Sequence, residues 1–137
     1  MAFLALAGVA VASLALRVHY SNDTEPCSIN EKWDCGRVNH SDYAVIYHVP
    51  VAAVGIAGYV ALGVLSLMRR RALVAGLSCA GLAFSLYLTS IESNVLQVYC
   101  LYCVISLAII LLLSAVSLWW VMSDAIGRRR HRRLFGE

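Results

Sequence analysis

Long apolar segments alternate along this chain with short polar ones. Four apolar segments are recognisable, at about residues 2–16, 49–68, 72–91 and 98–122. A helix needs roughly 20 apolar residues to cross a hydrocarbon core of about 30 Å, and the last three segments reach or approach that length. Because only helices and closed barrels satisfy their backbone groups in lipid, the pattern predicts an all-α bundle of four transmembrane helices.

The first segment is short for a membrane span and also suits a cleavable signal peptide. No basic residue precedes it, however, and its end, Leu-Ala-Leu followed by Arg17, is a poor small-residue cleavage site. We therefore expect the first segment to be retained as a helix.

Composition supports a membrane location. Of 137 residues, 61% are hydrophobic and 14% are charged, whereas an ordinary soluble domain is about 25% charged. The length suits one integral membrane domain spanning residues 1–137. The net charge of +3 does not indicate a nucleic-acid partner, because eight of the eleven basic residues form two clusters beside apolar segments, at positions 69–71 and 128–133.

These arginine clusters predict the orientation in the bilayer, since basic loops remain in the cytoplasm. The first cluster fills the link between the second and third helices, and the second lies in a basic tail at 123–137. Four crossings place both clusters and the N-terminus on the cytoplasmic side. The loops at about 17–48 and 92–97 then face the periplasm, the cell exterior or the ER lumen, and the arginine-rich ends favour a bacterial inner membrane.

The outer loop at 17–48 holds five acidic residues and three basic ones. Its last part, Ser41 to Tyr47, has the pattern of a short amphipathic helix capped by Asn39 or Ser41, which would cover the mouth of the bundle. Pro50 suits the first turn of the second helix, where its missing N–H costs little.

The five cysteines carry the candidate chemistry. Cys27 and Cys35 lie in the outer loop, and Cys100 and Cys103 form a Cys-Leu-Tyr-Cys motif at the outer end of the fourth helix. A helix N-terminus stabilises the thiolate that attacks disulfides, and a loop pair can exchange with the helix pair through a mixed disulfide. The pattern therefore predicts an electron relay at the membrane rim, where apolar quinones are also available.

Two other interpretations fit the same residues. Two structural disulfides on an oxidising face would suit a non-catalytic receptor or assembly subunit. Four cysteines could instead hold zinc, with His19, His40 and His48 as further ligands, although lone histidines in a polar loop are more often solvated and we expect no metal. A Cys-x-x-Cys within one helical turn is strained and reactive, which favours redox turnover. We expect Cys79, in the third helix, to pack as a small hydrophobe.

The cysteine arrangement resembles the vitamin K epoxide reductase family. The loop reads Cys27-x7-Cys35-Gly-Arg-Val-Asn-His-Ser, similar to the family's Cys-x7-Cys followed by Arg-Val and then Ser. The last helix begins Tyr-Cys100-Leu-Tyr-Cys103, where an aromatic residue precedes the active Cys-x-x-Cys. The loop cysteines also come first, whereas in the DsbB family the Cys-x-x-Cys comes first.

This resemblance implies a role for each cysteine. Cys100 and Cys103 would form the active disulfide, with Cys103 next to the quinone ring. Cys35 would exchange with Cys100, and Cys27 would meet the external protein thiol. Electrons would pass from a reduced thioredoxin-like protein, of the DsbA type and acting in trans, to a quinone of the ubiquinone, menaquinone or vitamin K type.

One departure from the family concerns the quinone contact. Animal members carry a tyrosine four residues after the second active cysteine, where this chain has Leu107. Ser106 points to another side of the helix, so Tyr47 and His48 are the candidates for a polar contact. This difference favours quinone reduction over epoxide reduction.

Overall fold

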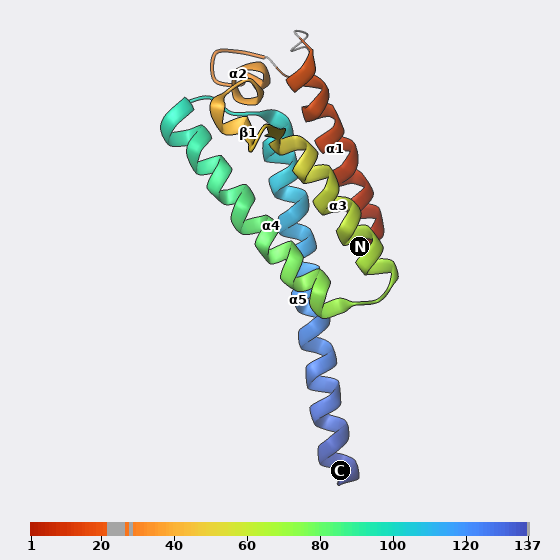
Figure 1. Cartoon of the computed structure of the whole chain (residues 1–137). Helices are drawn as coiled ribbons and strands as arrows, with labels where there is room; N and C mark the ends of the chain where they lie inside the picture. Colours follow the sequence, from red (N-terminus) through yellow and green to blue (C-terminus); the bar gives the residue numbers. More distant parts are fainter. Residues whose placement is uncertain (22–26, 28, 137) are drawn as a thin grey trace.

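Four long helices dominate the computed structural model, which describes residues 1–21, 27 and 29–136. The helices are α1 (Ala2–Tyr20), α3 (Val51–Leu67), α4 (Arg71–Ile91) and α5 (Leu101–Phe135). Figure 1 shows them as a bundle, with the C-terminal part of α5 projecting beyond the other three. The shorter elements gather at the opposite end of the bundle (Figure 1).

The surface and helix lengths indicate a membrane protein. Among the described residues, three helices are long and apolar enough to cross a bilayer: α1, α4 with its continuation to Leu96, and α5. With 17 residues, α3 is at the lower limit of a membrane span. Large apolar side chains such as Phe3, Leu86 and Leu111 are at least half exposed on the bundle surface. Because soluble proteins rarely expose so much apolar surface, this helical bundle is an integral membrane protein.

Two helices extend further than their apolar segments predict. The first continues to Tyr20 rather than ending near residue 16, and the last continues to Phe135 rather than ending near residue 122. Arginine is a good helix former, so a helix need not stop where its polar residues begin. The expected basic tail at 123–137 is therefore mostly the final turns of α5. That helix ends at Phe135, and its C-cap is Gly136, whose φ of +69° is readily adopted by glycine.

The amphipathic helix expected over Ser41 to Tyr47 does not form. In its place are a single 3-10 turn, η1 (Asp42–Ala44), and an antiparallel hairpin of β1 (Val45–Ile46) and β2 (Val49–Pro50). The β-branched residues of this segment favour extended backbone. Tyr47 and His48 form the turn with positive φ values of 49° and 68°, as in a tight two-residue hairpin.

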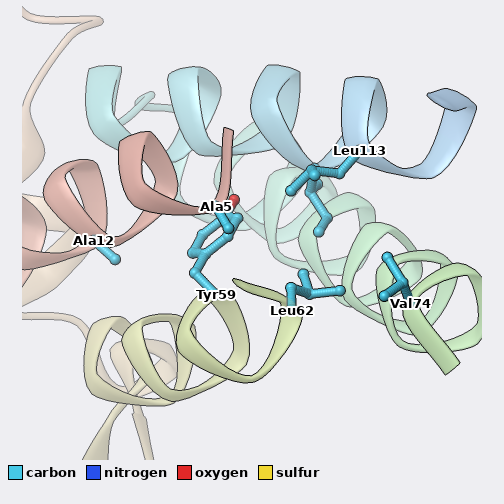
Figure 2. Packing of buried hydrophobic residues seen from close by; sticks show 7 residues of the cluster. Ala5, Ala12, Tyr59, Leu62, Val74 and Leu113 are labelled. Carbon is cyan, nitrogen blue, oxygen red and sulfur yellow. The ribbon is translucent and has the colours of Figure 1, made fainter. Parts of the chain in front are cut away.

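Small residues bring α1 close to α3. The ring of Tyr59 lies against Gly8, where an added Cβ would be 2.6 Å from the ring carbon Cγ. Small residues at such positions allow membrane helices to approach closely and pack. Figure 2 shows Tyr59 between these two helices, and Leu113 of α5 facing Leu62 of α3 and Val74 of α4. The buried cluster consists of Ala5, Ala12, Tyr59, Leu62, Val74, Ile110 and Leu113.

Polar contacts join α4 to α5. The buried hydroxyl oxygens of Ser78 and Ser117 are 3.1 Å apart. Near the start of α4, Arg71 forms an ion pair with Asp124 and lies 4.6 Å from the centre of the Trp120 ring. The link between α3 and α4 lies at the same end of the bundle as the projecting part of α5 (Figure 1). Both arginine clusters are therefore at one end, and the cysteine-bearing loop is at the other.

Candidate active site

A short backbone pairing attaches the outer loop to the segment before α5. Tyr99 donates its N–H to the carbonyl oxygen of Lys32 at 2.7 Å, and Asp34 donates its N–H to the carbonyl oxygen of Tyr99 at 3.1 Å. Residues 98–100 therefore lie extended against residues 32–34 instead of being helical. This pairing explains why α5 begins later than the apolar pattern predicts.

The pairing brings three sulfur atoms together. The helix α2 (Cys35–Asn39) starts directly after the paired loop residues, and Cys100 is the N-cap of α5. Cys27 and Cys35 form a disulfide with a Cα–Cα distance of 5.7 Å. The Cys100 Sγ atom is 3.3 Å from Cys35 Sγ, although the two residues are 65 positions apart. All three residues are at most 1% exposed, so a free thiol lies in contact with a disulfide in a site that excludes water.

The start of α5 favours the thiolate form of Cys100. A hydrogen bond with the Cys103 side chain lowers the pKa of the Cys100 thiol below its ordinary value, against the opposing effect of burial. Backbone N–H groups of Cys103 and Tyr102 act in the same direction. This electrostatic environment agrees with the prediction that a helix N-terminus activates the Cys-x-x-Cys.

Asn39, at the end of α2, connects the loop to the sulfur cluster. It is 6% exposed, and its side-chain amide donates to the Cys35 carbonyl oxygen at 2.9 Å and to Cys100 Sγ at 3.5 Å. Its own carbonyl oxygen is hydrogen-bonded to the ring of His19 on α1. Asn39 therefore fixes the position of Cys35 and supplies a donor to Cys100. The sequence pattern had indicated only a helix cap at this residue.

A buried acid lies on the other side of Cys100. Glu92 begins η2 (Glu92–Leu96), a π-helical turn that follows α4, and it is 3% exposed. Its carboxyl accepts the Cys100 N–H at 3.2 Å. A buried carboxyl is costly unless it is hydrogen-bonded, so the start of α5 stabilises this position.

A cavity of about 340 Å³ lies between α1, α3, α4 and α5 and is covered by α2 and η1. This volume lies in the range of small-molecule pockets, which are mostly apolar with a few polar groups. Most of its wall consists of aliphatic residues and glycine. The polar groups in the wall include Asn39, Tyr59, Glu92, Tyr102, Cys103 and Ser106. Tyr59 donates its hydroxyl to the Ser106 carbonyl oxygen at 2.9 Å, which fixes one polar pair in this wall.

Comparison with known proteins gives the family. A sequence model described as the vitamin K epoxide reductase family matches residues 1–118 of the 137. The chain belongs to the vitamin K epoxide reductase family. This confirms the resemblance inferred from the cysteine motifs and identifies the chain as a membrane oxidoreductase. Among curated proteins, none matches the chain.

Three of the four expected quinone contacts of this vitamin K epoxide reductase homologue do not line the cavity. Tyr47 is 95% exposed and His48 is also exposed, because both form the outward turn of the hairpin. Leu107 instead packs against the buried core cluster. Of the expected contacts, only Cys103 is in the cavity wall.

Several polar residues of the wall were missed by the sequence interpretation. Glu92 had a readable signal, because it is a single acid directly after an apolar segment. Tyr59 also had one, as a single tyrosine within the apolar segment at 49–68. Ser106 was considered only as a replacement for the family tyrosine, whereas here it is the partner of Tyr59.

The structure also shows where the cysteines and histidines considered as metal ligands lie. Within the described part of the chain, the group that could hold an ion is Cys27, Cys35 and Cys100, and two of these are joined in a disulfide. Zinc requires thiolates, which a disulfide does not offer. The ring of His40 is hydrogen-bonded to a backbone carbonyl oxygen of α2. Cys79 is a half-buried free thiol on α4.

Proposed function

We propose that this protein passes electrons from a reduced thioredoxin-like protein, through its two cysteine pairs, to a membrane quinone. The observation that supports this most directly is the 3.3 Å distance between Cys35 Sγ and Cys100 Sγ. Reacting atoms in a near-attack arrangement are about 3–3.5 Å apart. The second observation is that Cys103, one helical turn from Cys100, lies in the wall of an apolar cavity.

The proposed relay begins when the partner dithiol reduces the Cys27–Cys35 disulfide. The Cys35 thiolate then attacks Cys100 in the Cys100–Cys103 disulfide, forming a mixed disulfide and releasing Cys103 as a thiolate. Cys27 attacks Cys35, which restores the loop disulfide and leaves Cys100 reduced. The structure, with a loop disulfide and two free thiols on α5, corresponds to the state after this transfer. The helix dithiol then gives two electrons and two protons to the quinone and becomes a disulfide.

The partner and the membrane orientation belong to the same proposal. Cys27 is 1% exposed in this state, so attack by a partner protein requires this sulfur to become more accessible. Four crossings, including the 17-residue α3, put the cysteines on the periplasmic side and both arginine clusters in the cytoplasm. A bacterial inner membrane, which contains ubiquinone or menaquinone and faces a periplasm with DsbA-like proteins, suits this arrangement.

The test is quinone reduction by the purified full chain in detergent with a dithiol donor. We expect turnover with at least one of several quinones, and loss of turnover in both Cys100→Ser and Cys103→Ser. Cys79→Ser is the matched control, because Cys79 is also a free thiol but lies outside the sulfur cluster. Wild-type activity in either motif variant would contradict the relay. A folded wild-type protein that reduces none of the quinones would instead support two structural disulfides.

A further inference from the structure

The wall of the cavity contains one charged residue within the described part of the chain, and that residue is Glu92. Its carboxyl accepts the Cys100 N–H at 3.2 Å, and Cys103 lies in the same cavity wall. Glu92 therefore lies beside the Cys100–Cys103 motif and faces the space proposed for the quinone. Lipid-facing or structural positions in a membrane protein rarely carry an acid, and buried acids in such proteins mark functional sites.

A structural role alone does not account for this choice of residue. The described part of the chain contains one ion pair, Arg71–Asp124, and it lies at the other end of the bundle, so it does not compensate the Glu92 carboxyl. A glutamine at this position would accept the Cys100 N–H equally well through its amide oxygen and would have a smaller desolvation cost. What a glutamine cannot do is gain and lose a proton. Glutamate and glutamine therefore have similar shapes at this position but differ in their ability to transfer a proton.

We propose that Glu92 is the acid–base group of the quinone half-reaction, an inference that rests on the proposed function. Oxidation of the Cys100–Cys103 dithiol forms one S–S bond and releases two electrons and two protons, and the quinone gains the same number of each to become a quinol. Glu92 accepts the proton of the Cys103 thiol as this sulfur gives up electrons, and transfers it to a quinone oxygen. The second proton leaves the Cys100 sulfur as the S–S bond forms and follows the same route to the quinone. Glu92 ends the cycle in the form in which it began.

The test compares two activities of the full-length protein in detergent. The first is quinone reduction by a dithiol donor. The second is thiol–disulfide transfer from the loop pair to the α5 pair without quinone, followed by acid quench, alkylation and mass spectrometry. A general acid–base group contributes about 10²–10⁴-fold to rate. We therefore expect Glu92→Gln to slow quinone reduction by at least about 100-fold and to slow thiol transfer by much less.

Two further variants distinguish catalysis from folding. Glu92→Asp retains a carboxyl and should recover part of the quinone activity that Glu92→Gln loses. Glu31→Gln, at an exposed position of the outer loop, is the control for loss of an acid and should resemble the wild type. Equal loss of both activities in Glu92→Gln, or no recovery in Glu92→Asp, would assign Glu92 a structural role and overturn the proposal.

The outcome also separates this inference from the function on which it rests. A wild-type protein that reduces quinones together with an equally active Glu92→Gln variant would refute only the role of Glu92. A folded wild-type protein that reduces no quinone would refute the proposed function, and the acid–base role with it.

Discussion

Replacing Asn39 with alanine removes a side-chain donor that the outer loop places on Cys100. The wild-type amide donates to the Cys35 carbonyl oxygen at 2.9 Å and to Cys100 Sγ at 3.5 Å. A hydrogen bond between neutral groups contributes about 1 kcal/mol and one to a charged group about 1.5–3 kcal/mol. Cys100 is negatively charged during the exchange reaction. Because the hydrogen bond to its sulfur is long, we take the lower value for a charged group, about 1.5 kcal/mol. A loss of that size slows a reaction roughly tenfold.

The exchange between cysteine pairs can be measured without quinone. Protein oxidised at both pairs is mixed with less than one equivalent of a small dithiol, quenched in acid at intervals and alkylated. Mass spectrometry of the peptides then reports when reduced thiols move from the loop pair to the α5 pair. We expect Asn39→Ala to slow this movement about tenfold. Asn39→Asp should slow it further, because a carboxylate beside the sulfur disfavours the thiolate.

A matched asparagine provides the control. Asn94 also donates its side-chain amide to the backbone carbonyl oxygen four residues earlier, at 2.9 Å, but it is exposed and is not bonded to a sulfur atom. Asn94→Ala should therefore exchange at the wild-type rate. Folded Asn39→Ala and Asn39→Asp proteins that both exchange as fast as the wild type would refute the role assigned to Asn39.

Two further predictions concern packing and thiol ionisation. Gly8→Ala places a Cβ 2.6 Å from Cγ of Tyr59. Such overpacking costs about 1–3 kcal/mol, so the thermal unfolding temperature in detergent should fall. Gly76→Ala, where an added Cβ has open space, is the control, and equal unfolding temperatures of the two variants would contradict the packing argument. Because the Cys103 hydrogen bond lowers the pKa of Cys100, the thiolate absorbance of Cys100 should persist to lower pH than that of an ordinary cysteine and disappear as the pH falls through the lowered pKa. In Cys103→Ala this transition should move to higher pH, and an unchanged transition would contradict the assigned cause.

The apolar pattern was sufficient to predict a helical membrane protein, since each long helix is specified by its own residues and the bilayer. The family was predicted equally well, because its motifs are local in sequence. Helix ends were less predictable. The apolar segment at 98–122 begins with residues that pair with the outer loop, and its C-terminal continuation is helical beyond the apolar residues. Neither effect is visible in hydropathy alone.

The residues around the candidate site were harder to predict because their roles depend on tertiary contacts. Asn39 donates to Cys100 only because the backbone pairing of Asp34 with Tyr99, 65 residues later in the sequence, places α2 beside the start of α5. Tyr47 and His48 were expected near the quinone because a helix was predicted there, and a hairpin turn directs them outward. Because a hairpin forms in place of the expected helix, Tyr47 and His48 are not part of the cavity wall. Glu92, an acid directly after an apolar segment, and Tyr59, a single tyrosine within one, could by contrast be recognised from the sequence.

In the proposed relay, the position of Cys103 gives the two cysteine pairs separate tasks. It lines the cavity, whereas the other three sulfurs of the relay are buried between α2 and the start of α5 and are not part of the cavity wall. A quinone in the cavity therefore has no direct access to the loop disulfide, and a partner protein at the loop has no direct access to the quinone. Cys100, at 3.3 Å from Cys35 and one helical turn before Cys103, is the sulfur through which the two half-reactions must communicate. Such separation prevents the quinone from reacting with the loop pair before the helix pair has been reduced.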